Sequence, residues 1–288
     1  MSNEKNRVAF ISVLAAIFLT GFKLVVGLIT GSLGILSEAL HSGLDLVAAV
    51  ITLFAVRISA KPADREHHYG HGKVENLSAL IETLLLFITC FWIIYEAVHR
   101  LVTGKTDIEV TVWSYVVVIT SILIDLSRSR ALSRVAKKYN SQALEADALH
   151  FSTDIWSSAV VLLGLICANF GFFFADSVAA LVVAMIVIFV CYKLGKRSVD
   201  MLLDRATPNL QEKAEQAIRR IPEVTRFHDL RLRSSGADNF IEVCIHVDPM
   251  MGVGEAHLIA HRVADSIKGS ISHSRVTVHA EPESPDDF

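Results

Sequence analysis

Six apolar stretches, each long enough to cross a lipid bilayer, fill most of the chain before residue 206. A helix of about 20 apolar residues spans the hydrocarbon core, and backbone polar groups in lipid must be bonded within the helix. Hydrophobic residues make up 52% of the 288 residues, charged residues make up 20%, and the mean hydropathy is +0.46, which is unusual for a soluble domain. The sequence therefore predicts a polytopic α-helical membrane protein with six transmembrane helices, over residues 8–30, 33–56, 77–101, 110–132, 148–170 and 175–194.

Positive charge is distributed unequally between the two sides of this prediction. Only Arg100 and Lys105 fall in the loops on one side of the membrane, whereas the loops and terminal segments on the other side carry many lysines and arginines. Cytoplasmic loops carry the excess of lysine and arginine, so both termini are expected in the cytoplasm. The net charge of −3 gives no basic surface for nucleic acid, and the bilayer is the expected partner of the apolar residues. The residues on the basic side are Lys5, Arg7, Arg57, Lys61, Arg65, Lys73, Arg128, Arg130, Arg134, Lys137, Lys138, Lys193, Lys196 and Arg197.

Two of the predicted helices carry a histidine and an aspartate four residues apart, His41 with Asp45 and His150 with Asp154. Positions i and i+4 lie on one helix face, so each helix offers one imidazole and one carboxylate side by side. A single polar residue at this depth could be only a helix–helix hydrogen bond, but two matched pairs favour a four-ligand metal site. Glu38 shares the face of His41 and could relay protons or simply line a wet cavity.

The predicted ligand set indicates which cation it would bind. Two imidazoles and two carboxylates suit tetrahedral zinc, and their two negative charges balance a divalent ion. Imidazole argues against magnesium and calcium, whereas iron, cobalt, cadmium and manganese stay open. Protons compete with metal for the same ligands, so we expect export of a divalent metal, zinc before the others, in exchange for protons by alternating access. No separate cofactor is expected.

A second domain is expected after the last apolar stretch. Hydrophobic runs shorten after Arg205, charges become more frequent, and Pro208 stands where a helix could begin. The predicted domains are a transmembrane domain over residues 1–206 and a cytoplasmic C-terminal domain over residues 207–288. Apolar spacing predicts elements in the order αββαβ, typical of a small two-layer α+β domain of the ferredoxin-like or metallochaperone-like type. These elements cover residues 210–221, 227–233, 241–247, 255–268 and 275–280.

These features together resemble the cation diffusion facilitator family of divalent-metal/proton antiporters. The resemblance rests on the paired histidine and aspartate in the second and fifth stretches, on the loop sequence from Asp64 to Lys73, and on the terminal αββαβ domain with its run from Val278 to Pro282. It covers nearly the whole chain and implies a homodimer. The family has aspartate or histidine at the position of His41, and the histidine version resembles its zinc-preferring members.

The same resemblance implies two further metal sites. In the loop after the second stretch, Asp64, His67 and His71 match a metal site of the family, although loop histidines are often simply solvated. In the terminal domain the family has a zinc site with a structural or regulatory role that helps to hold the dimer, and some members have histidine where Cys244 stands and aspartate where Glu281 stands. Both substitutes can ligate zinc, and the alternative is a set of ordinary surface residues. The matching terminal-domain residues are His228, Cys244, His257, His279 and Glu281.

Two other classes of function stay open at this point, a membrane-anchored metal sensor and an intramembrane metalloenzyme. Catalytic zinc keeps an open position and often uses H-E-x-x-H, a motif absent from this sequence, and four protein ligands would close the site. A sensor would not explain why the apolar stretches themselves carry ligands. We therefore expect a transporter and not an enzyme. The short fourth-to-fifth connection, without a histidine-rich tract, resembles bacterial members, so we expect a multi-pass protein of the inner, cytoplasmic membrane.

Overall fold

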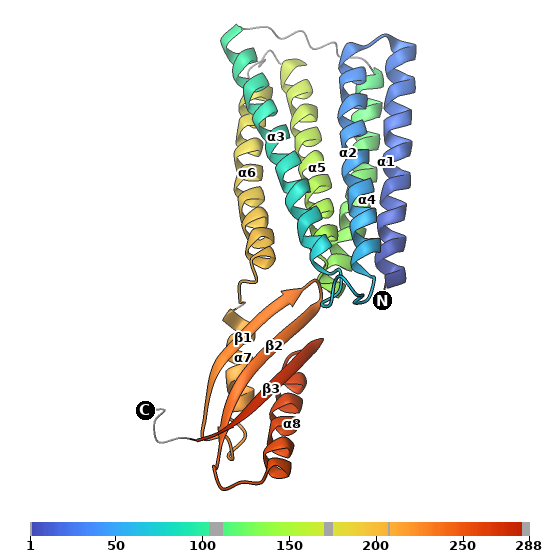
Figure 1. Cartoon of the computed structure of the whole chain (residues 1–288). Helices are drawn as coiled ribbons and strands as arrows, with labels where there is room; N and C mark the ends of the chain where they lie inside the picture. Colours follow the sequence, from blue (N-terminus) through green and yellow to red (C-terminus); the bar gives the residue numbers. More distant parts are fainter. Residues whose placement is uncertain (1, 104–111, 170–174, 207, 284–288) are drawn as a thin grey trace. The chain divides into compact units, whose positions relative to one another are not determined.

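The computed structural model describes residues 2–103, 112–169, 175–206 and 208–283, which divide into two compact units (Figure 1). The helical unit contains Met1–Pro62 and Val74–Val199, and the C-terminal unit contains Ala63–Lys73 and Asp200–Phe288. The loop of residues 63–73 is thus grouped with the C-terminal residues, which the sequence did not indicate. The domain ranges 1–206 and 207–288 stay a prediction.

Six long helices make up the helical unit, in agreement with the predicted polytopic helical fold (Figure 1). Within the described residues, four of them, α1 to α4, are long and apolar enough to cross a membrane. The helices exceed the apolar stretches because polar turns continue beyond the hydrocarbon core, which is about 30 Å thick. Residues 110, 111 and 170, at the ends of two predicted stretches, lie outside the described part. The helices are Ser2–Thr30 (α1), Leu33–Ser59 (α2), Lys73–Thr103 (α3), Val112–Tyr139 (α4), Gln142–Asn169 (α5) and Ala175–Leu202 (α6).

Local signals explain the sharp turn between the first two helices. Gly31 has a φ of 66°, the left-handed conformation that glycine adopts easily at a helix end. Ser32 then caps α2, and its side chain accepts a hydrogen bond from the backbone N–H of Ile35. The two helices therefore run antiparallel, and the first turn of α2 begins directly after α1 ends.

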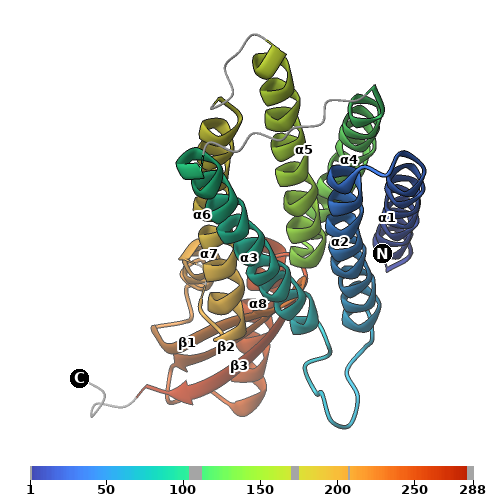
Figure 2. The same ribbon diagram turned by 90° about the horizontal axis from the view of Figure 1, so that it is seen from above.

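Two groups of helices pack within this unit. Figures 1 and 2 show α1, α2 and α4 on one side, α3 and α6 on the other, and α5 between them. Val13, Leu53, Leu132 and Phe151 belong to one buried cluster contributed by α1, α2, α4 and α5. Small residues allow close approach elsewhere: a Cβ at Gly195 of α6 would lie 3.1 Å from Cγ2 of Thr83 in α3.

The C-terminal unit contains the predicted αββαβ order (Figure 1). Its three-stranded sheet has the order β1-β2-β3, with β1 antiparallel and β3 parallel to β2. Ile241, Val243 and Ile245 on one face of β2 pack with Ile218 and Val263 from the two helices, and all five side chains are buried. The opposite face carries the polar side chains of the strands. The elements are Pro208–Ile218 (α7), Arg226–Ser235 (β1), Asp238–Val247 (β2), Val253–Ser270 (α8) and Ser274–Pro282 (β3).

Candidate metal sites

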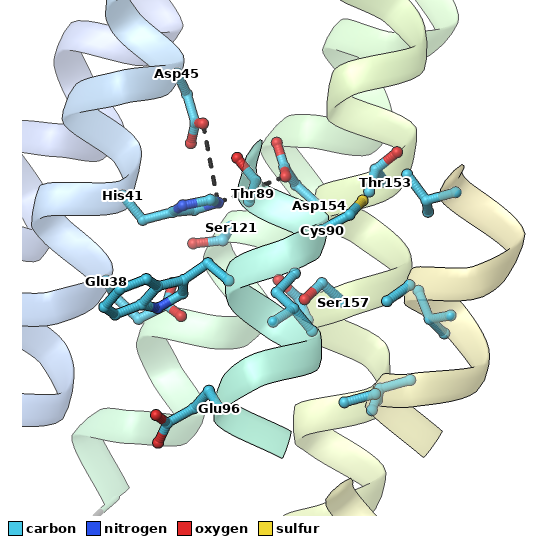
Figure 3. Close-up of a pocket in the computed structure, with 18 of the residues that line it drawn as sticks. Glu38, His41, Asp45, Thr89, Cys90, Glu96, Ser121, Thr153, Asp154 and Ser157 are labelled. Atoms are coloured by element: carbon cyan, nitrogen blue, oxygen red, sulfur yellow. Dashed lines mark ion pairs between the residues drawn. The ribbon is translucent and has the colours of Figure 1, made fainter. Parts of the chain in front are cut away.

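The four predicted intramembrane ligands lie together between α2 and α5. Nε2 of His150 is 2.9 Å from Oδ1 of Asp45 and 3.7 Å from Oδ2 of Asp154. Nε2 of His41 is 3.7 Å from Oδ1 of Asp154 and 3.9 Å from Oδ1 of Asp45. One donor atom from each of His41, Asp45 and Asp154 lies within 4.8 Å of the others, a spacing that could hold a metal ion (Figure 3).

Helix geometry produces this convergence. The i, i+4 spacing puts both ligands of each helix on one face, and α2 and α5 turn these faces toward each other. Asp45 and His150 are buried, and the ring of Phe151 meets His150 edge-on with centroids 5.6 Å apart. The packing leaves the imidazole little freedom to rotate, so the ligands are held near one another without an ion.

A cavity of about 320 Å³ reaches three of these ligands, His41, Asp45 and Asp154, from one end of the helical unit. Ser37 and Glu38 from the first turns of α2, and Ala97 from the late part of α3, line it, so the cavity lies toward the α1–α2 turn. Figure 3 shows Glu38 beside His41, with Asp154 pointing into the same space. The ligands are therefore accessible from this end.

On the side of the ligands away from the cavity, toward the N-terminal end of α1, buried polar side chains fill the space between the helices. One turn before His150, Asp147 accepts a hydrogen bond from Oγ of Ser12 at 3.3 Å. Glu82 of α3 accepts hydrogen bonds from Oγ of Ser78 at 3.0 Å and from the hydroxyl of Thr52 in α2. Direct side-chain contacts thus join the helices below the ligands.

Polar contacts between helices continue toward the N-terminal ends of α3 and α5. Asn76 donates a hydrogen bond to Gln142 at 2.7 Å, which joins α3 to α5. Glu75 forms an ion pair with Lys5 at 2.6 Å and accepts a hydrogen bond from Ser59 at 2.8 Å. We call this set of side chains the polar layer; its members are Lys5, Ser12, Thr52, Ser59, Glu75, Asn76, Ser78, Glu82, Gln142 and Asp147. The partners of Glu75 come from other helices, whereas Glu82 has one partner in α2 and one a turn earlier in its own helix.

The predicted loop ligands also lie together, within the C-terminal unit. Oδ1 of Asp64 is 3.3 Å from Nδ1 of His67, and Oδ2 of Asp64 is 3.4 Å from Nε2 of His71. Backbone N–H groups of His67 and Glu66 donate to Oδ1 of Asp64 and hold the pKa of that carboxyl below its usual value. The carboxylate is therefore ionised near neutral pH and suited to a cation.

The loop packs against the β1–β2 hairpin. The guanidinium of Arg233 lies 3.6 Å from the ring centroid of Tyr69, and that ring meets Phe240 edge-on with centroids 5.0 Å apart. Gly72 lies so close to the turn at Gly236 that a Cβ on either glycine would meet the backbone of the other segment. The loop thus forms part of the folded C-terminal unit.

The open face of the C-terminal sheet gathers most of the predicted ligands of that domain. The strand register places His228 beside Cys244 and Cys244 beside His279 in one row, and His246 beside Glu281 in the next. Glu281 carboxylate oxygens lie 3.1 Å from Nε2 of His279 and 3.9 Å from Nε2 of His228. All of these side chains belong to one chain.

His246 is the residue that the sequence reasoning left out of this set. Its Nε2 lies 3.1 Å from Nδ1 of His228, and His228, His246 and Glu281 could together hold a metal ion. Sequence alternation already put His246 on the face of Cys244, which was the available signal. Burial raises the pKa of the Cys244 thiol, with a further contribution from Glu281, so a thiolate is disfavoured there.

His257 occupies a different place from the other predicted ligands of this domain. It lies on α8, where its Nε2 is 3.1 Å from Nε2 of His261 on the exposed side of the helix. The buried side of α8 covers the other face of the sheet through Ile259 and Val263. Within the described part of one chain, His257 therefore does not join the strand residues.

Comparisons with known proteins give one consistent result for both parts of the chain. The family description "Cation efflux transmembrane domain" matches residues 9–203, and "Cation efflux protein, cytoplasmic domain" matches residues 206–283. The cation-efflux pump FieF of Shewanella oneidensis is 32% identical over 275 residues, which cover 94% of this chain and 92% of that protein. An uncharacterized transporter of Methanocaldococcus jannaschii is 31% identical over 279 residues, which cover 96% and 98%.

Among solved structures, a nickel form of the MamM CTD is similar to a part of this chain. It is 29% identical, its whole length aligns with 27% of this chain, and the TM-score is 0.26. The family assignment rests on the two domain matches, which follow one another in the expected order, and on relatives that align nearly end to end. The chain therefore belongs to the cation diffusion facilitator family, as a cation efflux transporter of the membrane rather than an enzyme.

Proposed function

We propose that this transporter exports a divalent metal ion, zinc before the others, in exchange for protons, and that His41, Asp45, His150 and Asp154 bind the ion during transport. The observation that supports this most is the convergence of these four side chains from α2 and α5, three of which, His41, Asp45 and Asp154, line a cavity. Two imidazoles and two carboxylates suit tetrahedral zinc and balance its charge, which lowers the cost of holding it in a poorly solvated site.

Hydrogen bonding between the ligands supports the exchange against protons. Nε2 of His150 and Oδ1 of Asp45 are 2.9 Å apart, a separation typical of a hydrogen bond with a proton between the two atoms. A metal ion that takes both atoms as ligands must displace that proton. Binding of metal and binding of a proton are therefore alternatives at this pair, which is the chemical requirement for antiport.

We also propose the orientation and location of the protein. The excess of positive charge at the end of the helical unit that holds the polar layer supports cytoplasmic termini and an inner-membrane location. With this orientation the cavity opens away from the cytoplasm, and the polar layer lies on the cytoplasmic side. The described conformation is then the one from which an exported ion leaves.

Metal flux in proteoliposomes tests the proposed function. An imposed proton gradient is expected to drive zinc in the opposite direction, and collapse of the gradient with a protonophore should slow the initial rate. Iron, cobalt, cadmium and manganese are compared at equal concentration, and faster transport of one of them would reassign the ion. Zinc flux that does not change with the proton gradient would contradict antiport. Binding of metal without flux of any metal would favour a sensor.

We propose that the C-terminal unit forms part of a homodimer and binds zinc on its open sheet face through His228, His246, His279 and Glu281. The short distances among these side chains within one chain support this ligand set. The loop residues Asp64, His67 and His71 are proposed as a separate regulatory site.

A comparison of two histidines tests the C-terminal ligand set. In the full-length protein, His246→Ala is expected to weaken zinc binding by at least about tenfold, whereas His257→Ala should change it by less than about twofold. Calorimetry is done with Asp154→Ala and Asp64→Ala in the background, so that only the C-terminal site is titrated. An equal loss in His257→Ala would mean that α8 completes the site, for example from the second chain of the dimer.

A further inference from the structure

A buried lysine lies in the cavity that reaches the proposed transport ligands. Lys23 of α1 is 4% exposed, its Nζ is 3.1 Å from Oε2 of Glu38, and it donates a hydrogen bond of 2.8 Å to Oγ of Ser42. Ser42 directly follows His41 in α2, and its carbonyl accepts a hydrogen bond of 2.9 Å from the hydroxyl of Thr20. An ammonium held this firmly at membrane depth usually has a functional role.

The position of Glu38 suggests what this role is. Glu38 lies one helical turn from His41 on the same side of α2 and lines the same cavity (Figure 3). Its side chain is 48% exposed, so a cation in the cavity can reach it. Glu38 is thus a carboxylate available to an ion that leaves His41 toward the cavity, and it is already paired with Lys23.

Lys23 also shares the cavity with two further carboxylates. Asp45, one of the proposed ligands, and Asp125, which is paired with Arg128 at 3.1 Å, line the same space. A unit positive charge repels a divalent ion twice as strongly as a monovalent one, and screening is weak in a partly buried cavity. The ammonium therefore weakens the hold of the site on a divalent ion from this side.

We propose that Lys23 promotes release of the transported ion: it keeps Glu38 from becoming a fifth ligand and repels the ion from the cavity side. This inference rests on the proposed function of the four-ligand site. Without the ammonium, the Glu38 carboxylate is free to add an oxygen ligand to an ion held by His41, and the ion leaves more slowly. Lys23 thus acts on the rate of release, and Glu38 is the residue through which it acts.

The variant Lys23→Met keeps a long side chain and removes the charge. It is expected to bind zinc at least about tenfold more tightly and to turn over about tenfold more slowly, because release becomes limiting. The double variant Lys23→Met with Glu38→Gln should recover affinity and turnover to within about threefold of the unmodified protein. Ser37→Ala, a neighbouring change in the same cavity lining, serves as the matched control.

Calorimetry and proteoliposome flux are measured together, with the other sites disabled by Asp64→Ala and His228→Ala. Slower turnover of Lys23→Met without tighter binding, and without recovery in the double variant, would overturn the proposal and make Lys23 a structural tie between α1 and α2. Absence of flux in the unmodified protein would overturn the proposed function instead, and the affinities of the variants would still test the relation between Lys23 and Glu38.

Discussion

Replacing Asp154 by alanine is expected to reduce metal flux by at least about 100-fold. Loss of a residue that only hydrogen-bonds to a metal ligand already costs about 10- to 100-fold, and loss of a ligand itself should cost more. Asp154 places its two carboxylate oxygens 3.7 Å from Nε2 of His41 and 3.7 Å from Nε2 of His150. Without it, the three remaining ligands carry a single negative charge. A divalent ion would then stay partly uncompensated in a poorly solvated site. Initial rates in proteoliposomes and calorimetric stoichiometry measure the loss.

Two further variants make this result specific. Asp154→Asn keeps the shape and removes the charge, so it should lose transport nearly as completely. Ser157→Ala lies on the next turn of α5 and lines the same cavity, and its flux is expected to stay within about twofold. Thermal unfolding of each variant checks that the helical unit is intact. Normal flux in folded Asp154→Ala would rule out the four-ligand transport site.

Replacing Gly72 by alanine should separate the loop of residues 63–73 from the β1–β2 hairpin. A Cβ at this position would overlap the carbonyl of Ser235 and lie 2.8 Å from the backbone nitrogen of Gly236. Backbone atoms cannot rotate aside as a side chain can, and overpacking of this kind costs about 1–3 kcal/mol. The equilibrium constant for packing of the loop against the hairpin would fall by a factor of roughly 5 to 150.

Limited trypsin digestion measures this separation, because Arg65 lies near the start of the loop and is followed by Glu66, which leaves its peptide bond open to cleavage. The bond after Arg65 should be cleaved several-fold faster in Gly72→Ala, and zinc should bind less tightly to the loop. Gly254→Ala is the control, since a Cβ there meets nothing within 4 Å. An unchanged digestion rate would show that the contact at Gly72 does not hold the loop in place.

Local rules were sufficient for the helical part of the fold. Apolar length predicted the helices, and the 3.6-residue period put His41 with Asp45 and His150 with Asp154 on shared faces. The contact between α2 and α5 is tertiary, and it could be expected only because four isolated ionisable groups in lipid would be unstable. Glu82 has one partner, Ser78, a turn earlier in its own helix, but its contact with Thr52 of α2 is tertiary, so local patterns did not indicate the polar layer as a whole.

The C-terminal unit departed from expectation where long-range geometry decides. A register shift follows His228 in β1, and Asp229 takes a φ of 52° there, neither of which alternation predicts. The shifted strand brings His228 next to His246, which family positions alone did not suggest. The packing of the loop depends on Gly72 and Gly236, which are far apart in the sequence and meet only in the folded chain.

In the proposed alternating-access cycle, the polar layer affects how easily the closed end of the helical unit can open. Side chains such as Asn76, Gln142 and Glu82 hold the helices together by hydrogen bonds. On opening, water can replace each of these bonds, and the net difference is only about 1 kcal/mol per bond. An apolar seal of the same extent would instead expose its full surface to water. In that cycle, a gate made of exchangeable hydrogen bonds would keep the closed and hydrated states close in free energy, so that binding of one small ion would be enough to shift the population between them.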